Sequence, residues 1–312
     1  MPKKTESAEK VKVVHSTSLA QAREVVRDAV SEGFLAPEIS KRLEKDLLNR
    51  IATSLDASSA RTLVDLYYRI QEHRVAIGNQ KRSTADDALI DYFHLQLRNI
   101  EESIKPALKI YGMSQVAGEW AMSQYGIGEI LSAGLLAHID ISRVETVGQI
   151  WSYAGLNPEQ KWEKGAKRPW NAELKKLCYK ISDSFVKFHN REDCFYGHLY
   201  AKEKARRVEL NESGAYAELA RTTLASKKFS DNDTRKAYES GKLPAGRIDA
   251  QARRYAVKIF LSHWFEVAYF AHNGKLPPKP WVLEHGGHAH YIPIPHIPEE
   301  HAQAIEDSKP KK

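Results

Sequence analysis

The chain has 312 residues and carries 47 Lys and Arg against 40 Asp and Glu, a net charge of +7. This length allows two or three domains with a substantial core, and the moderate positive balance is compatible with a polyanionic partner. Two cysteines, no signal-peptide core and no membrane-length apolar run argue against a disulfide framework and a membrane protein, so we expect a cytoplasmic location.

Helical periodicity dominates the first 110 residues. Residues 1–17 are polar and charged and are predicted to be a loose tail. Four runs then carry apolar residues at helical spacing, near 18–33, 37–51, 58–77 and 89–108. We expect 18–110 to form an all-α bundle or a long helical hairpin. The last two runs could form a coiled-coil arm or dimer surface, although plain core packing is the default interpretation.

Two glycines separate the next pair of helical runs, 115–122 and 130–139. The segment between them reads Tyr125-Gly126-Ile127-Gly128-Glu129. Glycine permits positive φ, and a helix that starts directly after it directs unpaired N–H groups and its positive dipole end at the turn. This arrangement suits a phosphate oxygen and resembles a helix-hairpin-helix, which binds the DNA backbone. The alternative is an ordinary tight turn.

A basic, tryptophan-containing segment follows the hairpin. Ser142 and Glu145 have the spacing of a capping box for a short helix at 143–152, and Asn171 can cap a later helix with a cationic face. Basic side chains neutralise phosphates and indoles can stack on bases, so we favour nucleic-acid contact over a solvated loop. The candidate residues are Lys161, Trp162, Lys164, Lys167, Arg168, Trp170, Lys175, Lys176 and Lys180.

The positive charge is concentrated behind the hairpin. Residues 151–210 contain 13 Lys and Arg against 8 Asp and Glu, which is +5 of the total of +7. A site for a polyanion requires such a concentration. The predicted DNA-binding site within a domain at 111–210 therefore combines the basic segment with the hairpin residues Gly126, Ile127, Gly128 and Glu129.

The C-terminal third changes character twice. Residues 211–247 are polar with turn signals, and helical periodicity returns at 248–271, so 211–272 is predicted to be a helical region with a connecting loop containing short helices. Prolines in 273–298 forbid regular helix. We therefore expect 273–312 to form an extended Pro- and His-rich arm that packs on the body or on another subunit, with Glu299, Glu300 and His301 in a frayed end.

The histidines of the arm and the two cysteines are the candidates for a metal or redox site. Four histidines in the arm could supply nitrogen ligands to Zn²⁺, but their spacing matches no zinc-binding template, so we favour a polar arm without metal. These histidines are His285, His288, His290 and His296. Cys178 and Cys194 are interpreted as small core residues.

Two stretches carry a family resemblance. They are Gly126-Ile127-Gly128-x-Ile130-Leu131-x-Ala133-Gly134-Leu135-Leu136-Ala137 and Thr146-Val147-Gly148-Gln149-Ile150-Trp151-Ser152-Tyr153-Ala154-Gly155-Leu156-x-Pro158. Together they resemble the C-terminal domain of insertion-sequence transposases of the IS110, IS116 and IS902 group, and the helical arms at 60–110 resemble the linker before it. The resemblance covers about 60–190 and implies DNA transposition or recombination with double-stranded DNA as the partner.

The chain also departs from that family. Its members begin with a RuvC-like domain that holds acidic metal ligands, and nothing in residues 1–60 resembles it. Their C-terminal domain has a serine nucleophile in a Ser-Gly pair, where this chain has Glu163-Lys164-Gly165. Ser182 and Ser184 lie further on and are more simply surface or packing residues. We therefore assign no catalytic residue and no cofactor, and Mg²⁺ would be needed only by an active recombinase.

Three functions stay open from the sequence. The chain is a DNA-binding protein of transposition, an active recombinase whose nuclease half comes from another chain, or an assembly protein in which the hairpin is only a turn. We expect a homo-oligomer. A guide RNA is a further partner that the resemblance leaves open, although no recognised RNA-binding motif is present.

Overall fold

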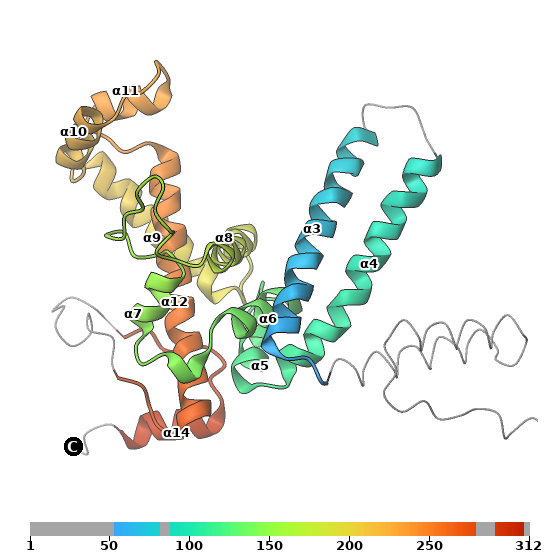
Figure 1. Cartoon of the computed structure of the whole chain (residues 1–312). Coiled ribbons are helices and arrows are strands. Elements are labelled where there is room, and N and C mark those ends of the chain that lie inside the picture. Colours follow the sequence, from blue (N-terminus) through green and yellow to red (C-terminus); the bar gives the residue numbers. More distant parts are fainter. Residues whose placement is uncertain (1–52, 82–87, 279–290, 309–312) are drawn as a thin grey trace, which may run out of the picture.

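The computed structural model describes residues 53–81, 88–278 and 291–308, and every regular element within these ranges is a helix. The prediction of a mostly α protein is confirmed. Two elongated arms diverge from a compact centre, one formed by α3 and α4 and the other by α9 and α12 (Figure 1). The predicted tail at 1–17 and the helices near 18–33 and 37–51 lie outside the described residues.

The first arm is a long helical hairpin of α3 (Ala57–Lys81) and α4 (Ala88–Met113). Val64 and Leu108 are buried near its base. Farther out, Arg74 donates two hydrogen bonds of 2.5 and 3.1 Å to the carboxylate of Glu101, which is 3 % exposed. This bidentate contact fixes the two helices relative to each other, because guanidinium and carboxylate match in plane.

The centre is built on α5 (Val116–Ser123) and α6 (Glu129–His138). Close packing depends on glycine, because a Cβ on Gly118 would lie 2.1 Å from the carbonyl oxygen of Gly112 in α4. At the other end of α6, Arg61 of α3 donates to the carbonyl oxygen of Ala137 over 2.6 and 3.2 Å. A cation is favourable there because the last carbonyls of a helix lack intrahelical partners.

The segment after α6 differs from the predicted helix at 143–152. The 3-10 helix η1 (Ile141–Arg143) precedes α7 (Val147–Tyr153), so the helix begins later than the predicted 143–152. The expected capping box of Ser142 and Glu145 is wrong. Gln149 instead accepts hydrogen bonds from the N–H groups of Glu145 and Thr146. Ser142 is engaged in the earlier turn, where the Asp140 side chain accepts its N–H.

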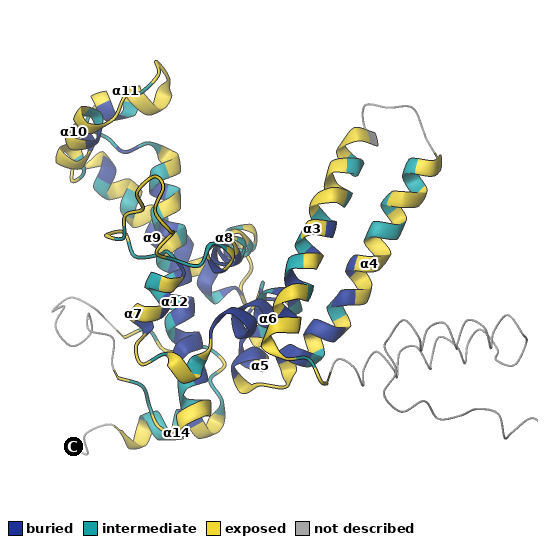
Figure 2. Ribbon diagram, viewed as in Figure 1, coloured by how far each residue is buried: buried dark blue, intermediate teal, exposed yellow. Residues whose placement is uncertain are grey.

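The main core lies between α8 (Ala172–Lys187), α9 (Phe195–Glu212) and α12 (Ala245–Asn273). Phe185, Tyr196 and Phe260 form a cluster with ring centroids 5.1 to 5.5 Å apart. Figure 2 shows this buried interior along α8 and α12. The predicted cap on α8 is confirmed, because the Asn171 side chain accepts two backbone N–H groups. Both cysteines are free thiols in buried positions, as predicted.

A charged network joins α9 to α12. Asp249 accepts hydrogen bonds of 2.5 Å from Tyr200, 2.9 Å from Lys204 and 2.6 Å from Arg253. Burial alone would raise the pKa of Asp249, but these three donors lower that pKa to about 2. The carboxylate therefore stays ionised and holds the two helices together.

The outer end of the second arm has a small core of its own. The predicted short helices in 211–247 are confirmed as α10 (Ala217–Ser226) and α11 (Asp233–Glu239). They enclose Ala220, Tyr238 and Leu243. Figure 1 places them at the tip, far from the first arm.

The C-terminal segment packs on the body. His263 contacts the carbonyl oxygen of Ile292 at 2.9 Å, and Trp120 donates to that of Pro295 at 2.9 Å. The prediction of a frayed end at 299–301 is wrong. Helix α14 (Glu299–Asp307) forms there, and His301 is buried in a stacked contact with Phe270, 4.5 Å between ring centroids. The contact of His301 with Phe270 holds α14 on the body, and the periodicity of the sequence does not single out His301 for this role.

Candidate nucleic-acid interface

The glycine turn is half fixed in the body and half open. Gly126 has φ +90°, and a Cβ there would lie 2.8 Å from the Ser184 hydroxyl oxygen. That hydroxyl donates to the Gly126 carbonyl over 2.5 Å, and Ile127 is buried. Gly128 is exposed, and a Cβ there would meet nothing within 4 Å. The first glycine therefore serves the fold, whereas the second faces open space.

Gly128 is the N-cap of α6, and no side chain caps this end of the helix within the described structure. The helix begins with the bond from the Ser132 N–H to the Gly128 carbonyl. The N–H groups of the first turn have no intrahelical acceptor, and the helix dipole adds partial positive charge at the same end. An anion at Gly128 would accept hydrogen bonds from these N–H groups and would be attracted by the positive end of the helix dipole.

This helix end opens into a groove of about 710 Å³ between α3, α6 and α8. Four lysines line it, Lys105, Lys176, Lys180 and Lys187, together with three acids, Glu72, Glu129 and Asp183. Lys180 Nζ lies 3.9 Å from the ring centroid of Tyr68, which also lines the groove. Asp183 is paired with Arg253, so its charge is partly neutralised.

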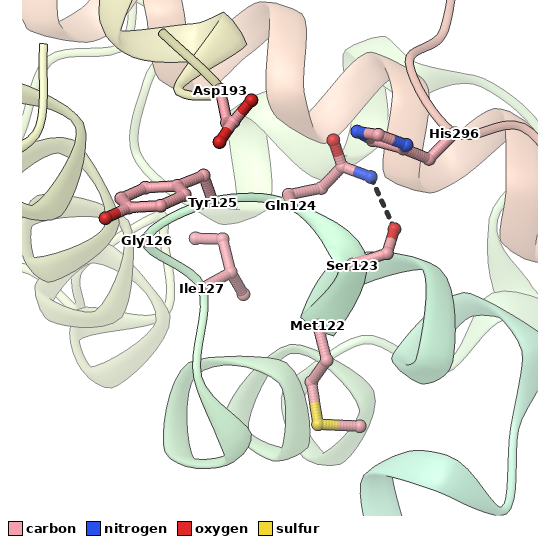
Figure 3. A pocket seen from close by; sticks show the side chains of 8 residues that line it. All are labelled: Met122, Ser123, Gln124, Tyr125, Gly126, Ile127, Asp193 and His296. Carbon is pink, nitrogen blue, oxygen red and sulfur yellow. Dashed lines mark hydrogen bonds between the residues drawn. The ribbon is translucent and has the colours of Figure 1, made fainter. Parts of the chain in front are cut away.

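The opposite side of the turn is braced by the C-terminal segment. A pocket of about 450 Å³ lies there, lined by residues 122–127 with Asp193 and His296 (Figure 3). The buried Gln124 side chain donates to the Ser123 hydroxyl, 2.8 Å, and to the Pro295 carbonyl, 3.4 Å. Residues 122–127 thus face the C-terminal segment, whereas Gly128 and Glu129 line the groove with α3 and α8.

The predicted basic segment divides between two surfaces. Lys176 and Lys180 line the groove beside the hairpin. None of the residues of the loop 159–170 lines the groove. Trp162 there donates to the Ala166 carbonyl, 2.7 Å, and lies under Arg168, while Trp170 lies under Lys175. Lys161, Lys164 and Lys167 are exposed on the same loop.

Sequence reasoning missed part of both surfaces. Lys105 and Tyr68 come from the long hairpin, about 70 and 100 residues before α8, and no local pattern connects them with the glycine turn. Lys187 was visible as one of the cations behind the hairpin. Lys258 of α12 contacts Trp151, and Arg254 of α12 lies close enough to Lys175 to lower its pKa; both come from outside the predicted domain.

The remaining sequence candidates are not gathered into a site. His296 is exposed with φ +51°, and His285, His288 and His290 lie outside the described residues. No group of three or more potential metal ligands occurs in the part of the chain that the structure describes. Ser182 is buried and donates to the Tyr179 carbonyl, 2.6 Å, while Ser184 supports the turn.

Comparison with known proteins locates the family resemblance on these elements. Residues 119–192, from α5 through the groove helix α8, match the model of the family described as Transposase IS116/IS110/IS902. No curated protein and no solved structure matches the chain. None of the described helices is long and apolar enough to cross a membrane. The similarity to the IS116/IS110/IS902 transposase family therefore lies in the segment 119–192.

Proposed function

We propose that the chain binds double-stranded DNA in transposition or recombination and holds its backbone in the groove between α3, α6 and α8. The family of residues 119–192 supports DNA as the partner. The observation that carries the proposal is the position of Gly128. It places the uncapped end of α6 in a groove that four lysines share.

The groove chemistry favours phosphate contact over base readout. Its donors are backbone N–H groups and lysines, which position a phosphate but carry no sequence information. Lys180 presents its charge over Tyr68, so its ammonium has a fixed position in the groove. Binding should accordingly be strong at low salt and similar for unrelated sequences.

Charge reversal in the groove tests this proposal. The variant Lys176→Glu with Lys180→Glu should weaken binding of two unrelated 20-base-pair duplexes by at least tenfold, measured by fluorescence anisotropy. The slope of log K against log salt should also fall by about 2, because two phosphate contacts are lost.

The matched control is Lys227→Glu with Lys228→Glu, which makes the same charge change at two exposed positions after α10. It should leave duplex affinity within about threefold. Equal losses in both variants would mean that only net charge matters, and unchanged affinity in the groove variant would reject the site.

A second candidate function, assembly through the long hairpin, has its own observation. Large apolar side chains are exposed along α3 and α4, among them Leu66, Val75, Tyr92, Phe93 and Ile100. Exposed apolar surface on this scale is typical of interaction sites. Light scattering in 0.5 M NaCl should give an oligomer for the native chain and a smaller mass for Tyr92→Glu with Phe93→Glu. A monomeric native chain at micromolar concentration would reject this candidate.

A further inference from the structure

A second surface with nucleic-acid chemistry is formed by the loop 159–170 together with residues of α7, α8 and α12. Three tryptophans there each lie under a cation, with separations to the ring centroid of 4.9, 4.1 and 3.9 Å. The pairs are Trp162 with Arg168, Trp170 with Lys175, and Trp151 with Lys258. We call these three pairs the tryptophan–cation face.

The face is held together by backbone and indole contacts. Trp151 donates to the Lys258 carbonyl, 3.2 Å, which fixes α7 on α12. The Asn171 N–H donates to the Tyr153 carbonyl, 2.8 Å, and brings the end of the loop back to α7. A Cβ on Gly155 would lie 2.8 Å from the Trp170 ring, so that ring is seated against the backbone. Residues far apart in sequence are thereby brought together.

The cations of this face are not ion-paired in the part of the chain that the structure describes. Within the described residues, Arg168, Lys175 and Lys258 form no ion pair with a carboxylate, and neither does exposed Arg254 beside them. Burial and then the charges of Arg254 and Arg168 lower the pKa of Lys175, and burial and then Arg254 lower that of Lys258. Arg254 is thus close enough to repel both Lys175 and Lys258, and Arg168 is close enough to repel Lys175.

Some cations elsewhere in the protein are paired with carboxylates. Arg74 is paired with Glu101, and Lys204 and Arg253 share Asp249. Each indole attracts its own cation, but the repulsion between the cations is unfavourable, and a bound polyanion would relieve it. Indoles add a surface on which bases can stack, and bases are accessible for stacking only in unpaired strands. The observations therefore favour a single strand over a duplex.

We propose that the tryptophan–cation face binds unpaired nucleotides of a single strand, at a site separate from the duplex groove. The two sites lie on opposite flanks of α8, because Lys175 faces Trp170 and Arg254 whereas Lys180 faces Tyr68 of α3. The inference rests on the proposed function only in that the chain handles nucleic acid. Single-stranded nucleic acid would be the second ligand of the chain, beside the duplex.

Fluorescence anisotropy with labelled dT20, rU20 and a 20-base-pair duplex separates the two sites. Lys175→Glu with Arg254→Glu should weaken single-strand binding by at least tenfold and lower its salt slope by about 1.4, because each lost cation contributes about 0.7. The same variant should bind duplex within about threefold of the native chain. Tighter binding of rU20 than of dT20 would identify RNA as the source of the strand, and the reverse would identify DNA.

The stacking part has its own test. Trp162 is 45 % exposed, so Trp162→Ala should leave the fold intact while weakening single-strand binding about tenfold. Trp162→Phe keeps an aromatic face and should restore most of that loss. Thermal unfolding checks that both variants are folded.

The outcomes distinguish this inference from the proposed function. The groove variant Lys176→Glu with Lys180→Glu should lose duplex and retain dT20 or rU20. If the face variant binds single strands as the native chain does, or loses duplex equally, the inference is wrong. If the groove variant retains duplex while the face variant loses single strands, the groove proposal fails and this inference stands. The Lys227→Glu with Lys228→Glu variant again controls for net charge.

Discussion

Gly128 offers a substitution that should raise stability and lower DNA binding at the same time. It is the N-cap of α6, its φ of −94° and ψ of −178° suit any residue, and a Cβ there would have no neighbour within 4 Å. Aspartate is among the preferred N-cap residues, because its carboxylate accepts N–H groups of the first turn. Gly128→Asp should therefore be accommodated without strain.

The expected gain in stability is modest. Replacing a glycine cap with aspartate contributes a few tenths of a kcal/mol, and the negative charge at the positive end of the helix adds about 0.3 to 1 kcal/mol. Together these stabilise the fold by about 1 kcal/mol. For a domain of this size that corresponds to a rise of about 2 to 4 °C in the midpoint of thermal unfolding.

The expected loss of affinity is larger. The new carboxylate occupies the N–H groups that the phosphate is proposed to contact, and it repels that phosphate. At about 4 Å the repulsion is about 1 kcal/mol in water and up to about 4 kcal/mol at a protein surface. A weakening of about 2 kcal/mol corresponds to roughly thirtyfold in the dissociation constant for a 20-base-pair duplex.

Calorimetry and fluorescence anisotropy on the same preparation measure the two effects. Gly128→Ser is the matched control, since it supplies a cap without charge and should show a smaller loss of affinity. Higher stability with unchanged affinity would refute the contact between α6 and phosphate. Lower stability would refute the capping argument itself.

Four further substitutions probe the fold and the groove. Glu129→Gln removes a negative charge from the groove and should strengthen duplex binding two- to fivefold by anisotropy. Gly126→Ala forces a side chain into φ +90° and against a serine hydroxyl, and should cost about 2 to 3 kcal/mol in urea unfolding, with a smaller cost refuting the strain. Arg74→Ala leaves the buried Glu101 carboxylate unpaired and should cost about 3 kcal/mol, whereas a cost below 1 kcal/mol would show that water reaches it. Asp249 has a pKa below its unfolded value, so its contribution to stability is present above about pH 4 and is lost as the pH falls toward 2. Asp249→Asn should remove that part of the acid dependence. An unchanged urea midpoint between pH 5 and 2.5 in the native chain would contradict this prediction.

Local chemistry predicted most of the helices but not all of their ends. Asn171 caps α8 as its side chain requires, because an N-cap acts through backbone N–H groups two and three residues away. The box at Ser142 failed because Asp140 engages that residue in its own turn, and two local hydrogen-bond patterns competed for the same backbone. His301 shows the opposite limit, since its contact with Phe270 is made across the fold.

The sequence by itself determined the helical class, the glycine turn before α6 and the concentration of positive charge after it. These follow from the periodicity, backbone freedom and charge of neighbouring residues, and neighbours are what a sequence shows. Only the tertiary structure decided that this charge serves two surfaces. Successive residues on a helix point about 100° apart, so Lys175 turns to α12 while Lys176 lines the groove with α3. The residues that each lysine meets lie on helices about 70 to 110 residues away in the sequence, and no local pattern shows which helices these are.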